Sequence, residues 1–199
     1  MDVFGHVGLT LAAAYPAEQL IRRCPVVNRQ PQATATSGEP PDDAPRSSWL
    51  DYRMVIVGSL IPDLIDKPLG LFVASDLVNS ASRSIAHGIV FALLLIGLST
   101  LTFQRTRLHG LLDLAGAAAW HLFLDQMWRQ PEIALWPFLG WSFPAGTADL
   151  TEWSSSHLRD MMAFYTDVPE IVGVAVILLF ALRLWRTRAG ALGPSPLLC

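Results

Sequence analysis

Five long stretches almost without charge constrain this chain more than any other feature of its sequence. They cover close to half of its 199 residues and run over residues 3–20, 54–73, 85–103, 108–127 and 169–185. A helix that crosses a bilayer needs about 20 mostly apolar residues. A core helix of a soluble protein usually keeps a polar face, whereas His87 is the single ionisable residue of stretch 85–103. The pattern therefore favours a membrane protein over a large soluble helical core.

The overall composition excludes several other classes of protein. Charged residues make up 16% of the chain, against roughly 25% in soluble domains. A chain that is 52% hydrophobic would not stay unfolded in water. The net charge of −3 argues against a nucleic-acid binder. Cys24 and Cys199 stand at opposite ends and make neither a disulfide framework nor a thiolate metal site.

The stretches 3–20, 54–73 and 108–127 are interrupted by proline or ionisable residues, so each predicts either a spanning or a re-entrant helix. Irregular backbone at membrane depth is tolerated only where it is buried in protein or lines a wet cavity. We predict an all-α, polytopic membrane helix bundle of four or five transmembrane or re-entrant helices, which forms one integral-membrane domain over residues 1–199. Within it, the Pro- and Ser-rich residues 22–53 predict a flexible polar linker. Residues 128–168, with four tryptophans, predict an ordered extracytoplasmic segment.

Arginines near the ends of the stretches predict the orientation, because cytoplasmic loops are enriched in Lys and Arg. Residues 128–170 instead carry six acidic residues against two arginines. All arginine clusters agree with five passes through the cell (inner) membrane, with the N-terminus outside and the C-terminus in the cytoplasm. Arginines also follow the first stretch instead of preceding it, which argues against a signal peptide.

This topology places three histidines and three carboxylates from four stretches at one depth near the outer face. They are His6, Asp63, Asp66, His87, His121 and Asp125. Ionisable residues in such segments cost free energy and mark functional sites. Histidine nitrogen and carboxylate oxygen are ligands of zinc and of harder divalent metals. His121 and Asp125 share a helix face at positions i and i+4, so they can hold one ion.

Several short motifs occur in an order that resembles a known family. They are Gly5-His6, the run GSLIPDLID from Gly58 to Asp66, Arg83 with His87, the run HLFLD from His121 to Asp125, and the run LWPF from Leu135 to Phe138. The series resembles the LexA-regulated inner-membrane proteins that are described as membrane-bound metal-dependent hydrolases. It is also distantly similar to the group of zinc phospholipase C and single-strand nucleases.

The resemblance implies a ligand set. Either Asp63 or Asp66, together with His87, His121 and Asp125, would hold one divalent metal of zinc type. His6 would complete a second site, with Asp125 bridging two ions. The family usually has closer aspartates than Asp63 and Asp66, so the spacing leaves open which of them is the ligand. It also has hydroxyl residues on both sides of the histidine, where this chain has Ala86 and Gly88.

On these grounds the sequence predicts a membrane-bound hydrolase that cleaves a phosphoester or lipid-like substrate at the outer interface with a metal-activated water. Asp63, Asp66 and Arg83 are the candidate catalytic residues, and Arg83 is either the holder of a phosphate oxygen or an ordinary interfacial arginine. Asp113 is either a partner of His121 or a polar residue facing the bundle. The expected partners are the bilayer and a small-molecule or lipid substrate, with no nucleic acid. A transporter or proton relay and a non-catalytic membrane scaffold are the alternatives.

Overall fold

The structure, a computed structural model, describes residues 3–23, 49–146, 151, 154–155, 158–159 and 168–191. The longer helices are α1 (Val3–Arg23), α2 (Tyr52–Pro68), α3 (Ile89–Thr106), α4 (Gly110–Leu124) and α7 (Val168–Ala191). The shorter ones are the π-helix Leu69–Val73, the 3-10 helices Ile85–His87 and Met127–Arg129, and α5 (Pro131–Ala134). The described residues contain no strand, so the all-α prediction is confirmed. Most of the predicted linker 22–53 lies outside the described residues, as do residues 147–150, 152–153, 156–157 and 160–167 of the predicted ordered segment 128–168.

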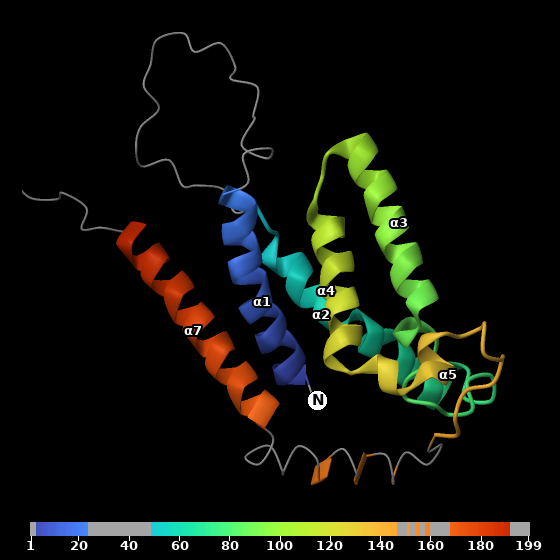
Figure 1. Cartoon of the computed structure of the whole chain (residues 1–199). Helices are drawn as coiled ribbons and strands as arrows, with labels where there is room; N and C mark the ends of the chain where they lie inside the picture. Colours follow the sequence, from blue (N-terminus) through green and yellow to red (C-terminus); the bar gives the residue numbers. More distant parts are fainter. Residues whose placement is uncertain are drawn as a thin grey trace, which may run out of the picture.

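The long helices pack in the order α7, α1, α2, α4 and α3 (Figure 1). Glycine allows the closest approaches between them. A Cβ atom on Gly8 of α1 would overlap the backbone of Gly173 of α7, and one on Gly58 of α2 would overlap the backbone of Leu114 of α4. Small residues are typical of membrane helix interfaces for this reason, since they let two backbones approach each other.

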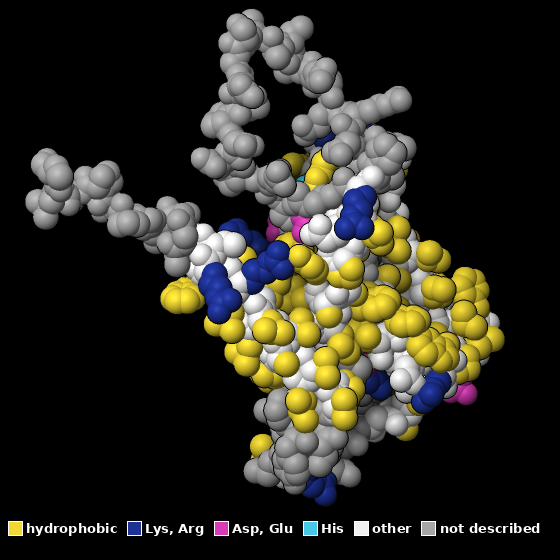
Figure 2. Space-filling view, turned by 60° about the vertical axis from the view of Figure 1, so that its left-hand side comes forward, with side chains coloured by type: hydrophobic (Ala, Val, Ile, Leu, Met, Phe, Trp, Pro, Cys, Tyr) yellow, Lys and Arg dark blue, Asp and Glu magenta, His cyan; other side chains and the backbone are white. Residues whose placement is uncertain are grey.

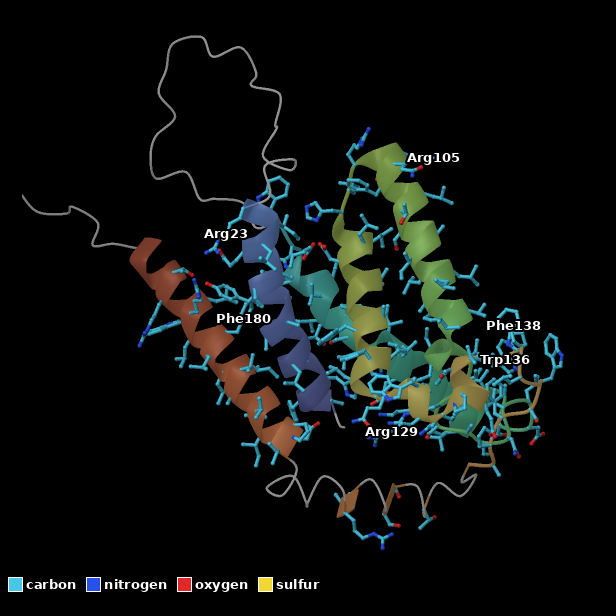
Figure 3. All side chains as sticks on the ribbon, viewed as in Figure 1. Arg23, Arg105, Arg129, Trp136, Phe138 and Phe180 are labelled. Atoms are coloured by element: carbon cyan, nitrogen blue, oxygen red, sulfur yellow. The ribbon has the colours of Figure 1, made fainter. Side chains whose placement is uncertain are left out.

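The two ends of the bundle differ in their charged and aromatic residues. Helices α1, α3 and α7 end on the side where α2 and α4 begin (Figure 1). Arg23 and Arg105 lie on that side, whereas Arg129 and Trp136 lie at the opposite end (Figure 3). The helix ends that carry the arginine clusters of the sequence therefore share one end of the bundle.

Two described helices are long and apolar enough to cross a membrane. They are 89–106 of α3 and 168–187 of α7, and each has 11% of its residues buried inside the structure. Their outward faces carry exposed side chains such as Leu94, Leu98 and Leu179. Figure 2 shows hydrophobic side chains across the middle of one face, with one group of Lys and Arg side chains at the end where α7 finishes and others near the opposite end. Such faces suit a hydrocarbon surrounding, because soluble proteins seldom expose large apolar patches.

The expectation that stretch 85–103 forms one continuous helix is wrong at its start. His87 belongs to the 3-10 helix Ile85–His87, and Gly88 has an extended conformation, with φ −82° and ψ 148°, that separates it from α3. The backbone N–H groups of Ser84, Ala86 and His87 donate to the carboxylate of Asp66. Because these donors bond to Asp66, the turn is fixed by α2 and not by helix propensity.

Candidate metal centre

The structure brings the six predicted residues into one buried cluster. His6 lies near the start of α1, Asp63 and Asp66 lie in the second half of α2, His87 precedes α3, and His121 and Asp125 lie at the end of α4. The side chains of Asp66, His87 and His121 are fully buried, and those of His6, Asp63 and Asp125 are nearly so. The cluster lies at the end of the bundle opposite Arg23 and Arg105 (Figures 1 and 3).

Asp66 fixes the orientation of His87. His87 Nδ1 lies 2.7 Å from Asp66 Oδ2, which also accepts the backbone N–H of Ser84 at 2.6 Å. The other oxygen, Oδ1, accepts the backbone N–H of Ala86 at 3.0 Å. Both oxygens are therefore engaged in holding the turn, and the Nε2 atom of His87 is left to face the centre. Asp66 therefore sets the orientation of this histidine.

His121 is held in the same way by a different group. Its Nδ1 lies 2.6 Å from the backbone oxygen of Ser59 on α2. A carbonyl oxygen only accepts hydrogen bonds, so Nδ1 must carry the hydrogen. The neutral ring therefore presents the lone pair of Nε2 to the centre. Metal-binding histidines are commonly oriented by such a second bond to a carbonyl or a carboxylate.

The two imidazoles point their Nε2 atoms at one another across a distance of 3.3 Å. Asp63 Oδ1 lies 3.5 Å from Nε2 of His87 and 3.9 Å from Nε2 of His121. Asp125 Oδ2 lies 3.6 Å and 3.9 Å from the same two nitrogens. Ligands bound tetrahedrally at about 2.0–2.2 Å from a zinc ion are separated by roughly 3.3–3.6 Å. The three distances from His87 Nε2 fall in this range, and the two distances of 3.9 Å from His121 Nε2 to the carboxylates lie just above it. The donor types suit a divalent ion of zinc type, and the donors lie close to the spacing that such an ion requires.

Asp125 is held from two sides. Its Oδ1 accepts a hydrogen bond from His6 Nε2 at 2.9 Å, and its Oδ2 accepts one from Arg83 Nε at 2.8 Å. The ring of His6 is stacked on that of His121, with the ring centroids 4.1 Å apart. His6, His121 and Asp125 thus make a second group of close donor atoms, which shares His121 with the group of Asp63, His87 and His121.

Formal charge also favours a cation in the centre. The cluster contains three carboxylates, those of Asp63, Asp66 and Asp125. Among the described residues, the Lys and Arg side chains that contact them are Lys67, 2.9 Å from Asp63 Oδ2, and Arg83. Buried charges are costly unless they are paired or bind a metal, so added positive charge would stabilise this cluster.

Two supporting residues, Lys67 and Glu170, were not predicted. Lys67 follows Asp63 by four residues, so the i, i+4 rule for helices could have found this pair. The carboxylate of Glu170 on α7 is buried and accepts the backbone N–H of Gly5 at 2.9 Å, beside His6. Glu170 could have been noticed in the sequence as a single acidic residue at the start of an apolar stretch. The contact ties the start of α1, and with it His6, to α7.

The idea that Asp113 is the partner of His121 is wrong. Asp113 Oδ2 accepts the backbone N–H of Asp51 at 2.8 Å and lies 3.0 Å from Nδ1 of His109. Asp113 lies two helical turns before His121 on α4, near the other end of that helix. It therefore fastens the start of α2 to α4 and does not belong to the centre.

Comparison with known proteins identifies a family. No curated protein and no solved structure matches the chain. A family model described as YdjM inner membrane protein matches residues 1–191, which include every helix and every residue of the centre. This match confirms the inner-membrane part of the resemblance seen in the motifs. The chain therefore belongs to the YdjM inner membrane protein family.

Proposed function

We propose that this protein is a membrane-bound metal-dependent hydrolase whose ion is held by Asp63, His87, His121 and Asp125. The observation that carries the proposal is the pair of Nε2 atoms of His87 and His121, which face each other 3.3 Å apart. Each imidazole is fixed through its Nδ1 atom, His87 by Asp66 and His121 by the Ser59 carbonyl. Two lone pairs that face each other at this distance repel unless a cation or a proton lies between them. Asp66 is then a positioning residue, and Asp63 is the aspartate that binds the metal.

The geometry favours one ion over two. Both groups of donor atoms include His121. Its Nδ1 is engaged by the Ser59 carbonyl, so Nε2 is the one ring nitrogen that can bind a metal. A nitrogen lone pair serves one ion, which leaves His6 and Asp125 as the protein ligands of a second site. In the one-ion arrangement, His6 holds Asp125 in place through their 2.9 Å hydrogen bond.

A phosphoester is the substrate class that the surroundings support best. A zinc ion held by these four residues would need a fifth position for water, to which catalytic zinc sites can expand. It would then supply a water nucleophile near neutral pH and polarise a phosphoryl oxygen. Arg83, which contacts Asp125, also lines a cavity of about 460 Å³ together with Arg129 and the acidic Glu132, so that arginines outnumber acids there by two to one. Guanidinium groups bind phosphate oxygens through several N–H donors in a plane. Arg83 can therefore hold a phosphate oxygen while its Nε keeps Asp125 in place.

We also propose that the protein crosses the membrane four or five times, with the centre near the outer face. The arginine-bearing helix ends share one end of the bundle, and the cluster lies at the other end (Figures 1 and 3). Because arginine clusters favour the cytoplasm, this arrangement supports an N-terminus outside and a C-terminus inside. Helix α4 is apolar but has only 15 residues. It would therefore cross a thinned or locally adapted part of the bilayer.

A structural polar network is the second candidate, favoured by the complete burial of Asp66 and its bonds to Ser84, Ala86 and His87. The two proposals differ in their response to chelation. We expect the full-length protein in mild detergent to hydrolyse a phosphodiester or phospholipid substrate, to lose this activity with EDTA, and to regain it with added zinc. Hydrolysis that persists after complete metal removal would contradict the proposal, as would the absence of hydrolysis by zinc-loaded, folded protein across a broad phosphoester panel.

A further inference from the structure

An apolar groove runs between α3 and α4 beside the candidate metal centre. It has a volume of about 510 Å³ and is lined by residues that include His87, Ala92, Ile96, Ala119, Phe123 and Trp128. His87 is the one ionisable residue among the described residues that line it. The volume is typical of a small-molecule pocket, for which about 300–1,000 Å³ is usual. The groove therefore offers a binding site to a hydrocarbon group and not to a polar molecule.

The groove owes its shape to residues of different size on the two helices. Ala92 on α3 and Ala119 on α4 are too short to fill the space between these helices, while Leu93 and Phe123 stand at its sides. Leu93 is 61% exposed and Phe123 is 54% exposed. Helix α3 is one of the two helices that are long and apolar enough to cross a membrane, with most of its surface unburied. In a bilayer this groove would open toward the lipid chains.

The groove shares one lining residue with the candidate centre and another with the cavity that contains Arg83 and Arg129. His87 lines the groove, and its Nε2 is one of the two nitrogens that face each other in the centre. Pro131 lines both the groove and the cavity that contains Arg83 and Arg129. An apolar site and a cationic site thus adjoin one cluster of metal-ligand type. A molecule with a hydrocarbon chain on one side of a phosphoester and a polar head group on the other matches this arrangement.

We propose that the groove between α3 and α4 holds a hydrocarbon chain of the substrate, so that the substrate is a lipid phosphoester taken from the bilayer. This inference rests on the proposed hydrolase function and names its substrate class. Burial of each methylene group contributes about 0.8 kcal/mol, so the chain would provide much of the binding free energy. A water-soluble phosphoester lacks this contribution and is expected to bind weakly.

Photolabelling tests the groove without relying on activity. The full-length protein would be placed in lipid nanodiscs with a phosphatidylglycerol probe that carries a diazirine on one acyl chain. Adducts would then be mapped by mass spectrometry. We expect labelling concentrated at the groove residues Leu93, Ile96 and Phe123, and reduced at least fivefold by Ile96→Trp or Ala119→Phe. Leu98→Trp is the matched control, because Leu98 is 63% exposed on the same helix and does not line the groove. Labelling spread evenly over the outer face of α3, or unchanged by both groove variants, would overturn the inference.

Kinetics separate a failure of this inference from a failure of the proposed function. Ala119→Phe is expected to lower kcat/KM for a long-chain phospholipid at least tenfold more than kcat/KM for bis(p-nitrophenyl) phosphate, while Leu98→Trp changes neither. Equal losses on both substrates in folded, metal-loaded Ala119→Phe protein would overturn the groove assignment and leave the hydrolase proposal standing. If the wild type hydrolyses neither substrate although the probe labels the groove, the hydrolase proposal fails and the groove remains a lipid-binding site.

Discussion

Replacing His121 with alanine is expected to remove the bound metal and to abolish hydrolysis. The loss should exceed the roughly 10–100-fold effect that is typical of a partner outside the ligand set. His121 is fully buried, and its Nε2 lies 3.3 Å from that of His87 and 3.9 Å from an oxygen of both Asp63 and Asp125. Metal content and initial rates on a phosphoester substrate are the measurements.

His109→Ala is the matched control for this experiment. His109 directly precedes α4, its side chain is 47% exposed, and its contact is with Asp113, outside the centre. We expect His109→Ala to keep both metal and activity. Because His121→Ala leaves a buried cavity, circular dichroism must show that it is folded, and His87→Gln gives a second variant with a smaller change in volume. Full metal content in folded His121→Ala and His87→Gln proteins would contradict the ligand assignment.

Replacing Asp66 with asparagine is expected to weaken both the fold and metal binding, although Asp66 is not a ligand. An amide keeps one acceptor oxygen and replaces the other by an NH₂ group. That group would face either the Ala86 N–H, which donates to Oδ1, or the donors to Oδ2, which are His87 Nδ1 and the backbone N–H groups of Ser84 and His87. Each buried group left unpaired costs about 1–3 kcal/mol of unfolding free energy. Loss of the orienting bond to His87 should weaken metal affinity about 10–100-fold.

Asp63→Asn separates the two roles, because Asp63 lies one helical turn away on α2. Its Oδ1 faces the two ring nitrogens and its Oδ2 pairs with the half-buried Lys67. We expect Asp63→Asn to weaken zinc binding at least as much as Asp66→Asn does, with a smaller decrease in thermal stability. Competitive zinc titration and thermal unfolding in detergent measure the two effects. The opposite order, with Asp63→Asn more damaging to the fold and less damaging to metal affinity, would show that the roles are exchanged.

Much of the candidate site could be predicted from the sequence because membrane topology is a strong constraint. In a helix that is expected to cross a membrane, the depth of a residue follows from its distance to the end of the helix. The arginines indicated which ends lie on the same side. His6, Asp63 and His121 lie in different helices, yet their positions along those helices placed them at one end of the bundle. That reasoning required only helix geometry and the tendency of arginine to stay on one side of a membrane.

The choice between Asp63 and Asp66 could not be predicted, because both lie on the same side of α2. Our proposal of Asp63 as the ligand rests on the turn before α3, whose backbone N–H groups bond to Asp66. This turn interrupts an apolar stretch that reads as one continuous helix, so tertiary contacts override local propensity there. The bond from the Gly5 backbone to Glu170 was equally hidden, since it joins residues 165 positions apart.

The central claim is that the cluster of His87, His121, Asp63 and Asp125 holds one divalent metal ion. Element-resolved analysis of the wild-type protein, purified in mild detergent and exchanged into metal-free buffer after zinc loading, tests it most directly. We predict close to one divalent ion per chain, retained through buffer exchange and released by a strong chelator. Folded wild-type protein that retains no divalent metal after loading would contradict the account and would leave the cluster as a structural polar network.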